Sequence, residues 1–209
     1  MENLEKVFKD KRVLVTGHTG FKGSWLTLWL VRLGAKVIGL SDDVPTTPSN
    51  FEVNNISKII EDNRVDIRNY DLVSNIVNSA NPDFVFHLAA QSLVRESYDQ
   101  PLKTFEINAM GTANILEALI GRDKKVTVVM ITSDKAYDNV EWVWGYKETD
   151  RLGGKDPYSA SKGMAELVIK TYFESYIKDK TDKITLGIAR AGNVIGGGDW
   201  AKDRIVPDC

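Results

Sequence analysis

The feature that most constrains this chain is a set of glycines between a predicted strand and a predicted helix. The β-branched run Arg12–Thr16 is typical of a buried strand, and Phe21, Trp25 and Trp29 follow at helical spacing. Between them lies Gly17-His-Thr-Gly-Phe-Lys-Gly23, with its glycines three residues apart. Glycine allows a tight turn and lets a pyrophosphate approach the amides of a helix N-terminus. We therefore predict a dinucleotide site here, in preference to a glycine turn without a ligand.

Strands and helices alternate along the rest of the chain. Further strands are predicted at Lys36–Leu40, Arg64–Ile67, Phe84–Ala90, Lys125–Ser133 and Ile184–Ala189, and long helices at Tyr70–Ala80, Pro101–Ile120 and Pro157–Lys178. This alternation predicts an α/β fold, a Rossmann-like doubly wound parallel sheet. Ligands of such sheets bind beyond the carboxyl ends of the strands, where the glycine-rich segment Arg190–Gly198 follows the last strand.

Composition and charge exclude several classes of function. The net charge of −2 over 209 residues leaves no basic footprint for nucleic acid. Cys209 is the sole cysteine, which excludes a disulfide framework and favours a reducing compartment. The first residues lack the apolar core of a secretion signal, and no run of about 18 apolar residues is present. We expect a cytoplasmic protein that binds neither membrane nor nucleic acid, and we predict no set of metal ligands.

A second cluster points to proton and hydride chemistry. Tyr158 and Lys162 are four residues apart and share one face of a helix, which Asp156 can cap and Pro157 can begin. An ammonium group favours the phenolate, so we expect a lowered pKa for Tyr158 and a role as base. Ser133, at the end of an apolar strand, can hold a substrate oxygen. An exposed helix pair is the alternative, and the glycine turn makes it the weaker one.

The adenosine end of the dinucleotide site is less defined. An acid about 20 residues past the glycines often binds the adenosine ribose. Asp42 and Asp43 follow Ser41 at the end of the second strand, and they serve either as ribose ligands or as solvated loop charges. We expect no arginine next to this strand end to bind a 2′-phosphate, which favours NAD over NADP. Asp66 and Ile67 are placed to hold an adenine ring, with Asp66 alternatively a turn or cap residue.

Two polar residues interrupt otherwise apolar or helical segments. His87 lies inside a predicted strand, and we expect a hydrogen-bonded core residue there and not a catalyst. Asn108 lies inside a long helix, where it bonds the backbone at a kink or faces water. Gly111 in the same helix predicts close packing. The segment 138–156 is long enough for a wall or lid over the site.

With these features in place, the chain resembles the extended short-chain dehydrogenase/reductase superfamily over essentially its whole length. The motifs that carry the resemblance are Thr16-Gly17-x-x-Gly20-x-x-Gly23, Asp66-x-Arg68, His87-Leu-Ala-Ala90, Asn108 with Gly111-Thr112, and Tyr158-x-x-x-Lys162. Within the superfamily it looks most like the nucleotide-sugar 4,6-dehydratases that act on CDP-glucose. The phrases shared with that branch are Gly17–Trp25, Ala90–Arg95, Thr132–Tyr137 and Arg190–Trp200.

The resemblance implies NAD as cofactor and assigns roles to residues. It implies cofactor contacts at Gly17, Thr19, Gly20, Phe21, Gly23, Asp42, Asp66, Ile67, Leu88, Ala89, Ala90, Asn108, Tyr158 and Lys162. It implies catalysis by Ser133, Asp134, Lys135, Tyr158 and Lys162, and substrate contacts at Arg95, Ser133, Asn193 and Arg204.

The implied reaction is the loss of water from CDP-glucose. Tyr158 takes the proton of the C4 hydroxyl as hydride passes to NAD, and the hydride later returns to C6. Lys135, neutral in a dry site, takes the C5 proton, where the dTDP-glucose branch carries a glutamate. Asp134, if protonated, delivers a proton to the leaving C6 hydroxyl. A local ion pair between Asp134 and Lys135 that shapes the turn is the alternative.

The resemblance also bears on how the chain is divided. Members of the superfamily continue far beyond residue 209, so we expect a fragment with a cofactor domain at 1–189 and the beginning of the nucleotide-sugar region at 190–209. The family implies a homodimer through helices 101–120 and 157–178, and a place in lipopolysaccharide O-antigen biosynthesis. The rival interpretations are a dTDP-glucose 4,6-dehydratase, a 4-epimerase, and a non-catalytic NAD-binding module.

Overall fold

Six parallel strands form one sheet in the computed structural model, which describes residues 2–204 and 208. The strands are β1 (Arg12–Thr16), β2 (Lys36–Ser41), β3 (Glu61–Arg64), β4 (Phe84–His87), β5 (Val126–Ser133) and β6 (Ile184–Ala191). Their order is β3-β2-β1-β4-β5-β6, so the winding reverses between β1 and β4. This confirms the Rossmann-like doubly wound sheet, whose ligand crevice lies where the strand order reverses. Cys209 lies outside the described residues.

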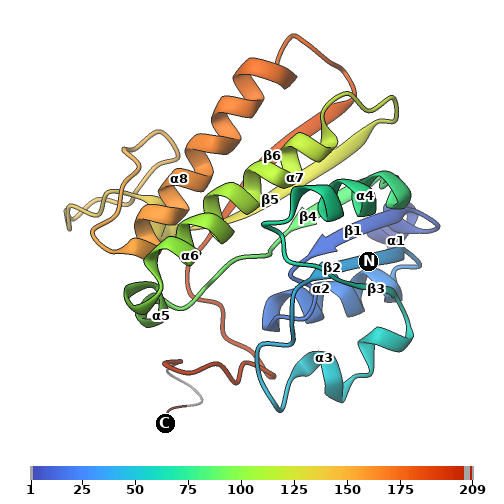
Figure 1. The fold of residues 1–209 in the computed structure, drawn as a ribbon, viewed down its shortest axis with the longest axis horizontal. Coiled ribbons are helices and arrows are strands. Elements are labelled where there is room, and N and C mark those ends of the chain that lie inside the picture. The colour runs from blue at the N-terminus through green and yellow to red at the C-terminus, as the bar shows by residue number, and fades with distance from the viewer. Residues whose placement is uncertain (1, 205–207, 209) are drawn as a thin grey trace.

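Helices cover both faces of the sheet (Figure 1). They are α1 (Glu2–Phe8), α2 (Phe21–Arg32), α3 (Asn50–Val53), α4 (Tyr70–Ala80), α5 (Val94–Asp99), α6 (Pro101–Phe105), α7 (Gly111–Leu119) and α8 (Pro157–Tyr172). The π-helical segment Glu106–Met110 joins α6 to α7, which confirms the long helix predicted over 101–120. Within the described residues, no helix is both long and apolar enough to span a membrane.

The core is divided by the sheet into two apolar layers. Successive side chains of a strand point to opposite faces, so Leu14 of β1 packs under α4, α7 and α8, while Val13 and Val15 pack under α1 and α2. All three are fully buried. A parallel strand that is covered on both faces carries apolar residues along its whole length. The apolar run of β1 therefore allowed this strand to be predicted from the sequence.

The third strand lies three residues earlier than predicted. We expected Arg64–Ile67 from its apolar residues, but β3 is the polar run Glu61–Arg64 at the edge of the sheet. An edge strand pairs through its backbone and needs no apolar side chains. Its register places Arg64 opposite Ser41, at the carboxyl end of β2.

A buried ion pair fastens β6 to α8. Two nitrogens of the Arg190 guanidinium donate hydrogen bonds to the Glu166 carboxylate. Nε lies 2.7 Å from Oε1, and Nη2 donates to Oε2. Glu166 Oε1 also accepts from Thr132 Oγ1 at 2.7 Å. The guanidinium lies 4.5 Å from the centroid of the Tyr137 ring. One carboxylate therefore connects β5, β6, α8 and the start of the loop over the site.

We predict that Glu166→Gln lowers the free energy of unfolding by about 3 kcal/mol, because it removes a buried carboxylate and leaves the partly buried Arg190 guanidinium with a neutral partner. Urea denaturation measures the change. The matched control is Glu174→Gln, which breaks the half-exposed pair with Lys178 and should cost no more than about 0.5 kcal/mol. Equal small losses in both variants would contradict the role of the buried pair.

Candidate active site

Three backbone segments meet at the glycine turn. Gly17 has φ +74, and a Cβ there would lie 2.7 Å from the amide nitrogen of Ala89. A Cβ on Gly23 would overlap the carbonyl oxygen of Gly17. Helix α2 starts after Gly20 without a side-chain cap, so among the described residues no side chain is bonded to the amides of its first turn. The turn therefore presents an open helix N-terminus at the carboxyl edge of β1.

His18, the residue after Gly17, was not singled out from the sequence. Its ring is buried, with Nδ1 3.0 Å from Ser41 Oγ and Nε2 2.8 Å from Asp62 Oδ1. Burial lowers the pKa of His18, although Asp62 opposes this. A Cβ on Gly39 would lie 2.5 Å from the ring. A glycine inside a strand marks such a close approach, so Gly39 was the available signal.

The end of β2 carries the residues predicted for the adenosine ribose. Asp42 is exposed there, and Thr19 Oγ1 donates to the carbonyl oxygen of Asp43 at 2.6 Å. The expectation that no arginine stands next to this strand end is wrong. Arg64, at the end of β3, lies opposite Ser41 in the pairing of β2 with β3. The Arg64 guanidinium is held by Asp62 at 2.9 Å and faces the Phe51 ring at 4.8 Å.

Asp66 is engaged by Arg68. The guanidinium bonds both of its carboxylate oxygens, at 3.1 Å and 2.6–2.9 Å, and this lowers the pKa of Asp66. The amide of Arg68 also donates to Asp66 Oδ1 at 2.9 Å, which is the contact of a turn residue, and the adenine contact of Asp66 stays a prediction. Ile67 is buried, and a Cβ on Gly111 would lie 2.6 Å from its Cγ2. The close packing predicted at Gly111 is confirmed.

Leu88, Ala89 and Ala90 continue from β4 toward the glycine turn. The amides of Leu88 and Ala89 donate to Thr16 Oγ1 at 3.2 and 3.1 Å. His87 is a buried residue with hydrogen bonds at both ring nitrogens, as predicted. Burial, assisted by the charge of Lys162, lowers the pKa of His87 to about 3. The ring is therefore neutral at ordinary pH.

Asn108 lies in the π-helical segment and bonds the backbone beyond β4. Its Oδ1 accepts from the amide of Gln91 at 2.8 Å, and its Nδ2 donates to the Gln91 carbonyl at 3.0 Å. Nδ2 also donates to Ser161 Oγ of α8 at 2.8 Å. Of the two interpretations, the backbone contact is therefore the right one.

The Tyr158 and Lys162 pair lies at the start of α8, as the spacing predicted. Asp156 Oδ1 caps the helix by accepting from the amide of Ser159 at 2.9 Å. Tyr158 and Lys162 are both buried, and Lys162 Nζ lies 5.9 Å from the centroid of the Tyr158 ring. Ser133, at the end of β5, lies close enough to Tyr158 to act on the pKa of its hydroxyl, which it lowers. The three predicted side chains are therefore brought together.

The expected lowering of the Tyr158 pKa is wrong. Burial is the largest influence and raises the pKa of Tyr158, although Ser133 and the charge of Arg204 act in the opposite direction. Lys162 is buried with it, and burial followed by repulsion from Lys22 lowers the pKa of Lys162 to about 8. Burial disfavours the charged form of both groups, the phenolate of Tyr158 and the ammonium of Lys162. Lys22, in the glycine turn, was not predicted to lie here.

Asp134 and Lys135 form a short 3₁₀ turn after β5. The Ser133 hydroxyl donates to Asp134 Oδ1 at 3.0 Å and accepts from the amide of Lys135 at 3.2 Å. Both side chains are exposed, so the described residues do not provide the dry setting expected for a neutral Lys135. They form no ion pair with each other in the described part of the chain, so the alternative interpretation is not supported either.

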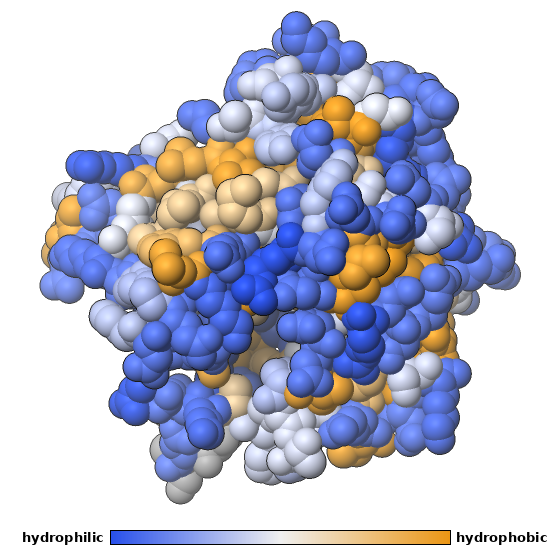
Figure 2. Space-filling model, viewed as in Figure 1, coloured by the Kyte–Doolittle hydropathy of each residue, from blue (hydrophilic) through white to orange (hydrophobic). Residues whose placement is uncertain are grey.

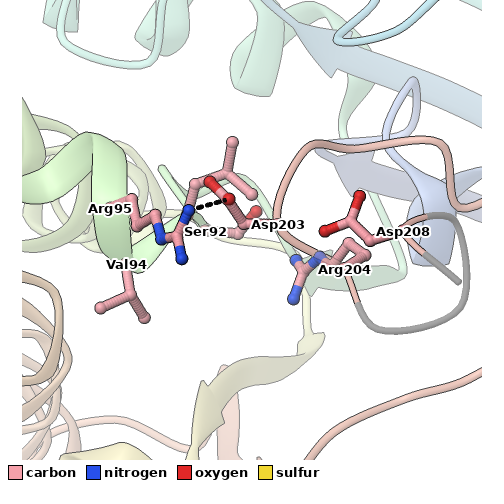
Figure 3. A pocket seen from close by; sticks show the side chains of 7 residues that line it. Ser92, Val94, Arg95, Asp203, Arg204 and Asp208 are labelled. Carbon is pink, nitrogen blue, oxygen red and sulfur yellow. Dashed lines mark hydrogen bonds and ion pairs between the residues drawn. The ribbon is translucent and has the colours of Figure 1, made fainter.

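A pocket of about 470 Å³ brings together two of the predicted substrate residues. It is lined by Ser92, Leu93, Val94, Arg95, Asp203, Arg204 and Asp208. Figure 3 shows Arg95 and Asp203 pointing toward one another, with Nη1 2.7 Å from Oδ1, and Arg204 on the opposite side. Asn193 is exposed and does not line this pocket.

The glycine-rich segment after β6 lies against the start of α2. A Cβ on Gly196 would lie 3.1 Å from the Phe21 ring, and Trp25 Nε1 donates to the carbonyl oxygen of Gly197 at 2.8 Å. Phe21, a predicted cofactor residue, therefore faces this segment. The segment joins the glycine turn to the pocket of Arg95 and Arg204.

The chain has sequence relatives among proteins of known function. A CDP-glucose 4,6-dehydratase of Salmonella typhimurium is 51% identical over 204 residues, which are 96% of this chain and 57% of that protein. A GDP-mannose 4,6-dehydratase of Vibrio cholerae is 31% identical over 178 residues, 79% of this chain and 46% of that protein. The chain thus spans about half the length of the curated relatives it matches.

Solved structures agree with the fold. The epimerase Mth375 of Methanothermobacter thermautotrophicus superposes with a TM-score of 0.81 at 27% identity, covering 99% of this chain and 59% of that one. The dTDP-glucose 4,6-dehydratase DesIV of Streptomyces venezuelae, solved with NAD bound, gives 0.78 at 25% identity, covering 94% and 60%.

The remaining comparison is with models of whole families. The model described as GDP-mannose 4,6 dehydratase matches residues 14–185, from β1 to the start of β6. Together with the glycine turn and the buried Tyr158 and Lys162, this shows that the chain belongs to the GDP-mannose 4,6 dehydratase family, within the extended short-chain dehydrogenase/reductase superfamily.

Proposed function

We propose that this chain is the cofactor-binding and catalytic part of an NAD-dependent dehydratase that converts CDP-glucose to CDP-4-keto-6-deoxyglucose. The observation that carries the proposal is the joint burial of Tyr158 and Lys162 beside Ser133, at the sheet edge where the glycine turn opens. The 51% identity to a CDP-glucose 4,6-dehydratase supports the choice of substrate. The expected division places the cofactor domain at 1–189 and the start of the nucleotide-sugar region at 190–209.

The residues of the turn fit a dinucleotide. Helix α2 begins without a side-chain cap, and its open first turn suits a pyrophosphate. A Cβ on Gly20 would meet just one atom within 4 Å, so the backbone here is accessible. The relatives solved with NAD, DesIV and the UDP-glucose 4-epimerase of Thermus thermophilus, support NAD as the cofactor. When bound, NAD supplies a hydride acceptor for C4 of the sugar and a hydride donor for C6.

Tyr158 is the proposed base for the C4 hydroxyl. Because burial raises the pKa of Tyr158, the phenol needs its neighbours to release a proton. Lys162 and Arg204 favour the phenolate by charge, and Ser133 holds the C4 oxygen through its hydroxyl. We also propose that the residues predicted from the sequence as cofactor contacts, among them Asp42 and Asn108, bind NAD.

The elimination step is assigned to the turn after β5. Asp134 protonates the leaving C6 hydroxyl and Lys135 takes the C5 proton, which the C4 ketone has made acidic. Lys135 is exposed in the described residues, so the proposal requires that the bound sugar and the rest of the protein exclude water from it. Arg95 and Arg204 are the proposed contacts of the nucleotide sugar, with Asn193 at the edge of the site.

A homodimer through α6, α7 and α8 is part of the proposal. Exposed apolar side chains lie on these helices at Leu102, Met110, Met164 and Leu167. Figure 2 shows apolar atoms gathered over α7 and α8 on the face turned to the viewer. Helices packed against their copies would bury this surface. The single cysteine supports a reducing, cytoplasmic setting.

The experiment that tests the function is a product mass spectrum of the whole protein incubated with NAD and CDP-glucose, with dTDP-glucose alongside. We expect the loss of one water from CDP-glucose alone. Tyr158→Phe should lower the rate by about 10²- to 10⁴-fold, because the proton transfer loses its base, while NAD still binds. An unchanged mass with both sugars, from protein that binds NAD, would favour a 4-epimerase or a binding module.

We predict that Gly23→Ala weakens NAD affinity at least about tenfold, because the new methyl group displaces the Gly17 carbonyl and with it the turn. Fluorescence titration with NADH measures the affinity. Gly187→Ala is the matched control, since a Cβ there meets no atom within 4 Å. A similar affinity in the two variants would contradict the placement of the cofactor at the turn.

We predict a pH dependence of stability that belongs to Lys162. Its pKa is about 8 in the folded chain against 10.5 as a free side chain, so the cost of burying the ammonium is full below pH 8 and disappears as the pH rises to 10.5. The wild type should therefore gain unfolding free energy relative to Lys162→Met between pH 8 and pH 10. Urea midpoints at both values measure this, and a constant difference would count against a buried ammonium.

A further inference from the structure

A chain of hydrogen bonds runs from the glycine turn to helix α8, and His87 lies at its centre. His87 Nδ1 lies 2.7 Å from Thr16 Oγ1, and Nε2 lies 3.0 Å from Thr112 Oγ1. All three side chains are buried. A buried network of hydrogen bonds is rigid when each donor has an acceptor. The position of each proton in the network is then fixed.

The hydrogen bonds of Thr16 show which nitrogen of the His87 ring carries no proton. Thr16 Oγ1 accepts from the amides of Leu88 and Ala89, so its single proton is left for His87 Nδ1. A proton on Nδ1 would compete with these amides for the hydroxyl oxygen. The Leu88 amide has a second acceptor, the Thr16 carbonyl at 3.1 Å. Within the described part of the chain, the Thr16 hydroxyl is the one hydrogen-bond acceptor of the Ala89 amide.

The hydrogen bonds of Thr112 also place the His87 proton on Nε2. Further hydrogen bonds, through Asn108, lead from Thr112 to α8. Thr112 Oγ1 donates to the carbonyl oxygen of Asn108 at 2.7 Å, so its oxygen accepts from His87 Nε2. Asn108 Nδ2 donates to Ser161 Oγ, which donates to the carbonyl oxygen of Tyr158 at 2.6 Å. The Asn108 turn is π-helical, a form often found at functional sites.

We propose that His87 is a positioning residue whose Nε2–H tautomer couples the Ala89 end of the glycine turn to the helix that carries Tyr158. If Nε2 loses its acceptor at Thr112, the proton can move to Nδ1, and the Ala89 amide then loses the Thr16 hydroxyl. Gly17 is packed directly on the Ala89 amide, so the turn shifts with it. The consequence for NAD rests on the proposed function, whereas the tautomer and the Ala89 hydrogen bond do not.

The first test needs no variant. The sequence has two histidines, His18 and His87, so long-range ¹H–¹⁵N spectra of the full chain contain two imidazole rings. We expect His87 to carry its proton on Nε2, with Nδ1 bare. A protonated Nδ1, or exchange between the two tautomers, would overturn the proposal.

The second test separates coupling from a merely structural role. Thr112→Val removes the acceptor of Nε2–H at constant shape, and Thr112→Ser retains it. We expect Thr112→Val to speed hydrogen exchange of the Ala89 amide and to weaken NAD affinity, each about fivefold, the effect of one neutral hydrogen bond. The control is Thr27→Val, because the Thr27 hydroxyl is buried and has no hydrogen-bond partner among the residues that the structure describes.

The outcomes are distinguishable from a failure of the proposed function. Unchanged Ala89 exchange in Thr112→Val, or an equal change in Thr112→Ser or Thr27→Val, overturns the coupling. Faster exchange at Ala89 confined to Thr112→Val supports it. If that result comes with a wild-type chain that binds no NAD, the coupling holds and the dehydratase proposal fails.

Discussion

The structure depends on the contact of three backbones at Gly17. The end of β1, the first turn of α2 and the segment after β4 approach so closely that a methyl group on Gly17 or Gly23 would overlap backbone atoms. No larger residue permits this approach, and the positive φ of Gly17 adds a second requirement for glycine. Because these segments meet at the point where the strand order reverses, the open end of α2 faces the crevice of the sheet.

The parts of the site that could be predicted from the sequence are those with short-range signals. The glycine spacing located the turn, and the Tyr158–Lys162 spacing with its Asp156 cap located the start of α8. Contacts between distant segments gave no such signal. Arg64 lies next to Ser41 because β3 pairs with β2, and β3 itself was misplaced because an edge strand carries no apolar pattern. His18 lies where its ring meets Gly39 of another strand.

Electrostatics was the least predictable part, since it depends on burial as much as on neighbours. The pairing of Tyr158 with Lys162 correctly indicated proximity but gave the wrong direction for the Tyr158 pKa. Desolvation acts on both groups, raising the pKa of Tyr158 above its ordinary 10.0 and lowering the pKa of Lys162 from 10.5 to about 8, so the two values move apart. Burial thus favours the neutral form of each side chain, and in the proposed reaction Tyr158 needs the hydrogen bonds and charges of its neighbours to act as a base.

The contrast between buried Tyr158 and exposed Lys135 follows from the architecture. The sheet and α8 surround Tyr158, so its side chain is enclosed by residues of this chain. The turn at Asp134 and Lys135 projects beyond the carboxyl edge, where the neighbouring pocket is built from Arg95 and the segment at 203–208. In the proposed reaction, the residues that serve the hydride step therefore all belong to the Rossmann-like sheet and its helices. The residues proposed for the loss of water lie in an exposed turn, where the bound sugar must exclude solvent.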